Sequence, residues 1–249
     1  MPLHTAAALV LRTYQLGEAD RIVVFLPEDR GKRRGVAKGA RRQKSRFGGG
    51  LEPLTSVRLA YFEREQRELV QLRHVETICS PLSGPDVSAL AHVGYFAELI
   101  DEWSLEGDPN EALFRLGSSV VEAIAAEVPI IELARYFEYW LLRLQGVYPA
   151  ITDCARCGLE LHDEALVIPT VGRVTCTQCE TPDNGVVLSA FSLSFLRQAR
   201  TVPPESLGSI ELSDSANRQL SELHRRMFKV HLHKDLKSER VIRELTRRP

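Results

Sequence analysis

Two Cys-x-x-Cys pairs constrain the fold of this chain more than any other feature. Cys154 and Cys157 form the first pair, and after eighteen intervening residues Cys176 and Cys179 form the second. Each pair places two sulfur atoms close enough to share one tetrahedral ion, so the two pairs together supply four thiolates. Gly158 follows the first pair, and glycine accepts the positive φ that turns backbone amides towards sulfur. We therefore predict a zinc ribbon over residues 150–186, holding one structural Zn²⁺ ion.

Two other interpretations of the cysteines remain, namely two disulfides or four unrelated buried thiols. Disulfides need an oxidising compartment, and the first five residues lack the basic segment that opens a secretory signal. Between the pairs, residues 165–168 and 171–174 have the composition of two short strands. Because protein sulfur fills all four positions of the predicted site, we expect the metal to stabilise the segment rather than to catalyse a reaction.

Charge is distributed unevenly along the 249 residues, although the net charge is only −1. Residues 1–80 carry fifteen Lys and Arg against nine Asp and Glu, whereas residues 81–153 carry three against twelve. A basic first part followed by an acidic middle favours binding to a polyanion. The chain has no run of about 20 apolar residues that could span a bilayer. We therefore expect a cytoplasmic, nucleoid-associated protein with no membrane partner.

The first eighty residues are typical of a small β-barrel. Five short β-rich runs are separated by turn residues, and they lie at residues 6–12, 21–26, 34–38, 56–62 and 68–72. This number and spacing of strands fits a closed barrel of the OB type, and an SH3-like barrel fits nearly as well.

Helical periodicity begins after residue 81. We predict helices at residues 86–105, 110–127, 129–144, 189–198 and 213–232, followed by a basic, amphipathic turn at 237–245. The fold class is thus α+β, with an N-terminal OB-fold domain at 1–80 and an α-helical domain at 81–249 into which the zinc ribbon is inserted.

Nine Lys and Arg residues, with no Asp or Glu among them, lie between residues 30 and 46. Such a density of like charge favours a bound polyanion, and the alternative is a solvated basic loop. Phe47 is the best candidate to stack on an unpaired base. With many cations and few aromatic side chains, we expect sequence-blind, salt-sensitive DNA binding. The predicted DNA-binding residues are Lys32, Arg33, Arg34, Lys38, Arg41, Arg42, Lys44, Arg46 and Phe47.

Motifs for phosphate binding, zinc hydrolysis and nucleophilic serine chemistry are all missing from the sequence. The acidic residues between Glu98 and Glu138 have the spacing of solvated helix faces rather than that of a catalytic carboxylate pair. We therefore expect a binding protein rather than an enzyme. A nuclease or hydrolase with an unrecognised site, and a zinc-ribbon transcription or RNA-binding factor, remain as alternatives.

Four segments, taken together, resemble the RecO family of bacterial DNA repair and recombination mediators. They are Gly-Glu-Ala-Asp-Arg-Ile at 17–22, the glycine- and arginine-rich stretch at 35–54, the segment that begins Arg-Tyr-Phe-Glu at 135–149, and His-Lys-Asp-Leu-Lys-Ser-Glu-Arg at 233–240. Each match is modest alone, but their order and spacing extend over essentially the whole chain.

The resemblance implies a protein that binds single- and double-stranded DNA and anneals complementary strands. It also implies that the protein, together with RecR, helps to place the RecA recombinase on strands coated by single-strand binding protein. The resemblance implies that Lys38, Arg41 and Arg42 contact DNA, and these residues belong to the run of cations between residues 30 and 46. The family also binds the acidic C-terminal tail of single-strand binding protein among its central helices. Because these helices are acidic here, a local cation is needed, and Arg135 is our candidate.

Overall fold

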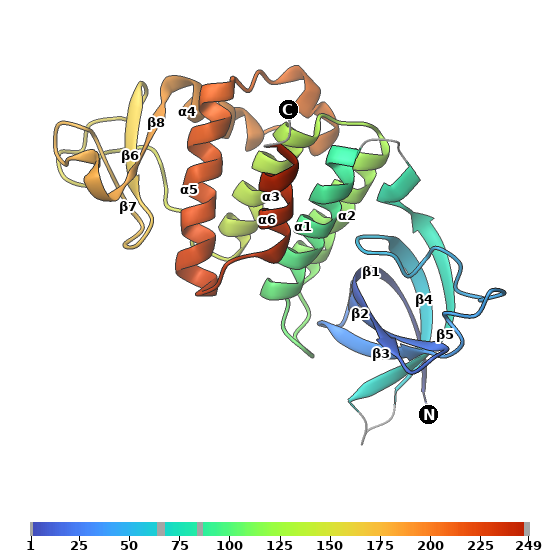
Figure 1. Cartoon of the computed structure of the whole chain (residues 1–249). Helices are drawn as coiled ribbons and strands as arrows, with labels where there is room; N and C mark the ends of the chain where they lie inside the picture. The colour runs from blue at the N-terminus through green and yellow to red at the C-terminus, as the bar shows by residue number, and fades with distance from the viewer. Residues whose placement is uncertain (1, 64–67, 84–86, 247–249) are drawn as a thin grey trace. The chain divides into compact units, whose positions relative to one another are not determined.

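The computed structural model describes residues 2–63, 68–83 and 87–246 (Figure 1). Its contacts divide the chain into two compact units, of which unit 1 comprises Met1–Glu127 and Leu236–Pro249 and unit 2 comprises Val128–Asp235. The predicted barrel segment 1–80 is therefore only part of a larger unit, since α1 and α2 pack on the barrel and α6 packs on α1.

Unit 1 contains a closed barrel of five strands. The strands are β1 Leu3–Leu16, β2 Asp20–Pro27, β3 Arg33–Ala37, β4 Ser56–Phe62 and β5 Leu69–Cys79. Their order around the barrel is β1-β2-β3-β5-β4, and β3 pairs with β5 in parallel. This crossed order confirms the OB-like barrel. β5 continues to Cys79, beyond the predicted end at residue 72. The prediction stopped there because Arg73 is a bulge residue opposite Ala60 and Tyr61 of β4, so Arg73 and His74 are both exposed and the alternation is interrupted.

The barrel core comes from the inward residues of all five strands. Phe25 and Tyr61 are fully buried and meet edge to face at 5.5 Å. Gly35 of β3 has no room for a side chain, because a Cβ atom there would lie 2.4 Å from Cδ1 of Leu72. Phe47 and Leu51, from the segment between β3 and β4, also lie in this core.

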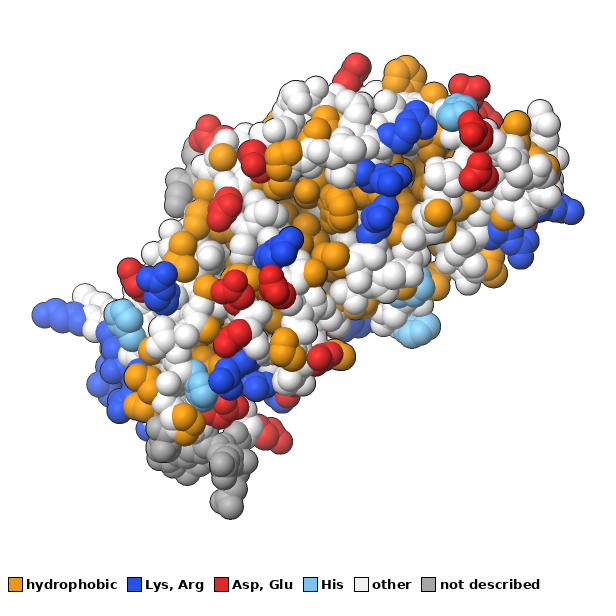
Figure 2. All heavy atoms as spheres, turned by 180° about the vertical axis from the view of Figure 1, so that it is seen from behind, with side chains coloured by type: hydrophobic (Ala, Val, Ile, Leu, Met, Phe, Trp, Pro, Cys, Tyr) orange, Lys and Arg blue, Asp and Glu red, His pale blue; other side chains and the backbone are white. Residues whose placement is uncertain are grey.

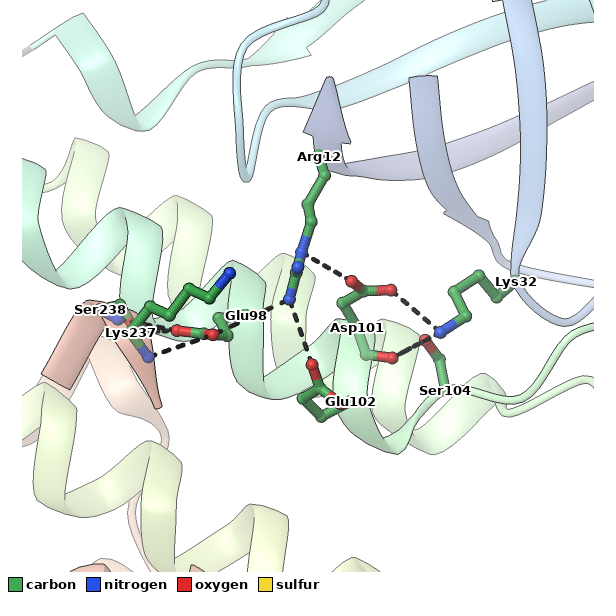
Figure 3. A network of polar contacts seen from close by, with 8 residues as sticks. All are labelled: Arg12, Lys32, Glu98, Asp101, Glu102, Ser104, Lys237 and Ser238. Atoms are coloured by element: carbon green, nitrogen blue, oxygen red, sulfur yellow. Dashed lines mark hydrogen bonds and ion pairs between the residues drawn. The ribbon is translucent and has the colours of Figure 1, made fainter. Parts of the chain in front are cut away.

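A network of charged groups joins the barrel to α1 Val87–Trp103 (Figure 3). The guanidinium of Arg12 on β1 lies 2.7 Å from Asp101 and 3.2 Å from Glu102, and Nζ of Lys32 lies 2.9 Å from the same Asp101 carboxylate. Burial alone would lower the pKa of Arg12, but Asp101, the Tyr14 side chain and Glu102 raise it above its ordinary value. The network therefore holds Arg12 charged and α1 against β1.

Unit 1 is completed by η1 Pro81–Ser83, α2 Glu111–Ala125 and α6 Lys237–Thr246. α6 packs on α1, and Glu98 of α1 accepts hydrogen bonds from the backbone N–H groups of Lys237 and Ser238. Burial would raise the pKa of Glu98, but its bonds to Ser238 and Lys237 lower it below the ordinary value. A carboxylate of α1 thus caps the first turn of α6.

Unit 2 consists of helices and a three-stranded sheet. Its elements are α3 Ile130–Leu144, β6 Glu164–Ile168, β7 Arg173–Thr175, η2 Pro182–Asn184, β8 Val186–Ser189, α4 Ala190–Ala199, η3 Pro204–Ser209 and α5 Asp214–Leu232. The sheet has the order β7-β6-β8. β8 was not predicted, because it is too short for its alternation to be evident in the sequence. Within the described ranges, no helix combines the length and the apolar character needed to cross a membrane.

Asp101→Ala tests the charged network. The substitution leaves Arg12 and Lys32 without their shared carboxylate, so we expect the free energy of unfolding to fall by about 1–2 kcal/mol. Urea denaturation followed by circular dichroism measures the change. Glu122→Ala is the matched control, because Glu122 is exposed on α2 of the same unit. Equal unfolding midpoints for the two variants would contradict the role of Asp101.

Candidate metal centre and nucleic-acid interface

The four cysteines of the two pairs come together at one point in unit 2. Their sulfur atoms all lie within 4.8 Å of one another, and Sγ of Cys157 is 3.9 Å from Sγ of Cys176. Four thiolates around one Zn²⁺ ion stand about 3.8 Å apart, so the cluster has the size of a tetrahedral metal site. All five cysteines of the chain are free thiols. This arrangement fits the predicted metal centre and disagrees with two disulfides or scattered thiols.

Backbone geometry positions both pairs of sulfurs. Gly158 adopts φ +71°, as predicted, and its N–H donates to the carbonyl of Cys154 at 2.9 Å. Hydrogen bonds from backbone N–H groups, that of Cys176 first, lower the pKa of Cys154 to about 6. The side chains of Cys176 and Cys157 raise the pKa of Cys179 to about 12. Four sulfurs this close cannot all ionise without a cation among them, which is the property of a metal site.

The structure divides the predicted DNA-binding residues into two groups, and the first group is engaged with the chain's own carboxylates. Arg33 lies 3.6 Å from Glu63, and Arg34 lies 2.9 Å from Glu106. Lys32 is the Asp101 partner already described, with only 18% of its side chain exposed. Lys32, predicted as a DNA contact, is therefore part of the fold instead, because its charge is neutralised beneath the surface.

The second group lies on a loop at residues 38–46, which we call the basic loop. Its five cations are exposed, and none has an ion-pair partner among the residues that the structure describes; they are Lys38, Arg41, Arg42, Lys44 and Arg46. The loop docks on the turn between β1 and β2: the N–H of Arg41 donates to the carbonyl of Ala19 at 2.9 Å, and its guanidinium donates to the carbonyl of Glu18 at 3.0 Å. Five uncompensated charges on a fixed loop are suited to binding phosphates.

The predicted base-stacking role of Phe47 is wrong. Phe47 is only 3% exposed and belongs to the barrel core, so neither face of its ring is open to a base. The guanidinium carbon of Arg46 stands 5.0 Å from the ring centre. Phe47 instead anchors the end of the basic loop in the barrel.

The predicted role of Arg135 in tail binding is also wrong. Arg135 is 8% exposed and donates to Glu138 at 2.8 Å, and the second oxygen of Glu138 lies 2.8 Å from Nδ1 of His224. Because a carboxylate only accepts, Nδ1 is the donor and Nε2 accepts from the hydroxyl of Tyr148 at 3.2 Å. Burial lowers the pKa of His224, which keeps the ring neutral in this chain of bonds. Arg135 is thus a buried partner and cannot meet a peptide at the surface.

A pocket that the sequence did not indicate lies elsewhere in unit 2. Its apolar lining includes the buried Leu193 and Leu196 of α4. Three exposed arginines also line it, namely Arg143, Arg197 and Arg200. Figure 2 shows a hollow of this kind, with blue basic side chains beside an orange floor. The pocket was missed because α3 and α4 are far apart in sequence.

Two of these arginines, Arg197 and Arg200, have no carboxylate within ion-pair distance among the described residues. Arg143 donates to the hydroxyl of Tyr139 at 2.9 Å and stands over the Trp140 ring at 5.5 Å. The pocket therefore combines an apolar floor with uncompensated positive charge, which is suited to an acidic ligand that carries an apolar group.

Comparison with known proteins assigns the family. The family model described as recombination protein O N terminal matches residues 1–81, and the one described as recombination protein O C terminal matches residues 84–240. The chain belongs to the RecO family. Relatives called DNA repair protein RecO include those of Geobacter sulfurreducens, 34% identical over 96% of this chain and 97% of the relative, and of Anaeromyxobacter sp., 31% identical over 95% and 94%. The protein of Koribacter versatilis is 40% identical over 70% of this chain and 71% of its own length.

The two RecO family models meet between residues 81 and 84, directly after β5. The N-terminal model thus covers the barrel together with the basic loop. The C-terminal model covers the cysteine cluster, the arginine-lined pocket and the α-helices from α1 to α5, and it ends within α6. Each candidate site of this RecO chain is therefore inside a segment that matches the family.

Arg135→Ala tests the buried role of this arginine. The change leaves Glu138 and His224 buried without their cation, so we expect the free energy of unfolding to fall by about 3 kcal/mol. Thermal or urea unfolding measures the loss. The matched control is Arg115→Ala, since Arg115 pairs with Glu111 on an exposed helix face and its loss should cost at most about 0.5 kcal/mol. If Arg135→Ala had the same free energy of unfolding as the unaltered chain, the buried role of Arg135 would be contradicted.

Proposed function

We propose that this RecO-family chain is a non-enzymatic recombination mediator that binds single- and double-stranded DNA through the basic loop and anneals complementary strands. The observation that carries the proposal is the set of five exposed cations without carboxylate partners, held on the barrel by backbone bonds to the β1–β2 turn. Following its family, it acts with RecR to help place RecA on strands coated by single-strand binding protein.

The proposed mechanism is electrostatic. Complementary strands repel each other through their phosphates, and cations that neutralise both backbones lower this repulsion until the bases pair. Lysine and arginine on a loop contact phosphates without reading base edges, so binding is sequence-blind. No covalent bond is formed or broken in this process, and the cysteine cluster offers no open ligand position for metal-assisted hydrolysis.

The salt dependence of binding tests this mechanism. Five phosphate contacts on a single strand give a log–log slope of roughly −3.5. Replacing both Arg42 and Lys44 by Gln removes two contacts, so the slope should become roughly −2.1 and annealing should slow. Fluorescence anisotropy with a labelled oligothymidine measures the slope.

The control is the pair of changes Arg33→Gln and Arg34→Gln. These residues belong to the same charge run but pair with Glu63 and Glu106, so the slope should stay near its original value. A flat salt response of the unaltered protein would refute phosphate-led binding. A slope that changes equally in both variants would refute the special role of the basic loop. Equal or better binding to RNA strands would favour an RNA-binding factor.

We further propose that the cysteine cluster holds one structural zinc ion, because four thiolates at tetrahedral spacing are the donor set that zinc prefers. Cys176→Ser should abolish metal binding and destabilise unit 2, whereas Cys79→Ser should retain one zinc per chain, because Cys79 belongs to β5 of unit 1 and is not one of the four clustered cysteines. Elemental analysis of the purified variants measures the zinc content. Metal-free wild-type protein with a normal unfolding profile would overturn this assignment.

The arginine-lined pocket replaces Arg135 as the proposed site for the acidic tail of single-strand binding protein. Its support is the juxtaposition of Arg197 and Arg200 with the apolar surface of Leu193 and Leu196. Carboxylates of the tail pair with the guanidinium groups, while an apolar side chain enters the pocket.

Replacing both Arg197 and Arg200 by Ala tests this site. At about 1 kcal/mol for each partly exposed ion pair, the Kd for a tail peptide should rise roughly 30-fold. Isothermal titration calorimetry measures it, and Arg115→Ala, an exposed arginine of unit 1, should leave the Kd unchanged. If the double variant binds the peptide as tightly as the unaltered chain, the tail binds elsewhere.

A further inference from the structure

The outer face of β1, β2 and β3 presents a row of apolar side chains that no element of the described chain covers completely. Tyr14 is 49% exposed and pairs in register with Ile22, which pairs in turn with Val36. Ile22 and Val36 are half-buried, and Leu16, two residues after Tyr14, is 38% exposed. Neighbouring strands lie about 4.8 Å apart, so the row from Tyr14 to Val36 extends across about 10 Å.

Among the Phe, Tyr and Trp rings of the described barrel, only that of Tyr14 is exposed. Phe25, Phe47 and Tyr61 are buried in the core. Phe62 is half-buried, and the guanidinium carbon of Arg73 stands 5.1 Å from its ring centre. The side chain of Tyr14 lies beside the guanidinium of Arg12, which the α1 carboxylates hold in place. The Tyr14 ring is therefore positioned in advance of any ligand.

This row continues directly into the basic loop. Lys38 is the first residue after β3, and it lines the same surface hollow as Val36. The loop is tied to the turn that follows β1, through the bond from the N–H of Gly39 to Asp20 at 2.8 Å and through the Arg41 bonds already described. An aromatic platform beside cations that bind phosphates is the arrangement by which barrels of this type hold single strands.

We propose that Tyr14 is the platform on which an unpaired base of single-stranded DNA stacks while the basic loop binds the neighbouring phosphates. This inference deepens the proposed function and rests on it. In a duplex both faces of each base are already stacked, so Tyr14 adds affinity for single strands alone. Tyr14 thereby makes the affinity for single-stranded DNA higher than that for duplex DNA, whereas the cations of the basic loop bind the phosphates of both forms.

The test compares two oligonucleotides that have the same number of phosphates, an oligothymidine and a chain of abasic sites of equal length. The unaltered protein should bind the oligothymidine about tenfold more tightly than the abasic chain, since stacking contributes per base and phosphate contacts are equal. Tyr14→Ala should remove this difference while leaving the salt slope and duplex affinity unchanged. Tyr14→Phe, which keeps the ring and loses the hydroxyl, should retain most of the difference.

Ile78→Ala is the matched control, because Ile78 is 53% exposed on the same barrel but lies on β5 seven residues beyond Gln71, about 23 Å along the strand from the row. It should behave as the unaltered chain. If Tyr14→Ala keeps the preference for oligothymidine over the abasic chain, the inference is wrong although the proposed function stands. If the unaltered chain binds neither oligonucleotide in a salt-dependent way, the proposed function itself fails.

Discussion

Charge compensation inside unit 1 determines which cations of the chain are left for a polyanion. Carboxylates of α1 and of the segments beside it neutralise Arg12, Lys32 and Arg34 at distances of 2.7–2.9 Å. These pairs hold the barrel to α1, so their charge has a role within the fold. The five cations of the basic loop have no ion-pair partner among the described carboxylates, so their charge is not compensated within the fold. The structure thus separates one continuous run of cations into a part that stabilises the fold and a part that can bind a ligand.

This separation explains why sequence charge alone overestimated the DNA interface. The nine cations between residues 30 and 46 look equivalent in the sequence, because their partners are remote: Asp101 lies 69 residues from Lys32. Phe47 was misjudged for the same reason. Its neighbours are arginine and glycine, which indicates a loop, but the ring is buried against strands of the barrel. Tyr14, in contrast, lies beyond the strand predicted at residues 6–12, and only the structure shows that β1 extends to Leu16 and that the side of β1 carrying Tyr14 is uncovered.

Features set by local sequence were predicted well. The cysteine spacing, the turn at Gly158 and the helix periodicities depend on residues within a few positions of one another, and each reappears in the structure. The burial of Arg135, in contrast, depends on residues that are remote in the sequence. Its partner Glu138 is three residues away on the same helix, but His224, which completes the buried network, is 86 residues from Glu138. A helical arginine beside a glutamate has the same sequence pattern whether it is solvated or buried.

The position of the cysteine cluster in the chain would give an ion bound there a more specific structural role than general stabilisation. Residues 148–152 line the arginine-lined pocket, and Cys154 follows them by two residues. Leu161 follows the first cysteine pair, and its N–H donates to the carbonyl of Thr152 at 2.8 Å. Thr152, at the end of the pocket wall, is therefore bonded to the turn that contains Cys154 and Cys157. Tyr148, at the other end of this wall, is held by His224. A short segment fixed at both ends has little freedom, and its rigidity lowers the entropy that a ligand must remove on binding. On the zinc assignment proposed above, loss of the ion should loosen the pocket in unit 2, whereas the basic loop, which is held by hydrogen bonds within unit 1, should keep its position.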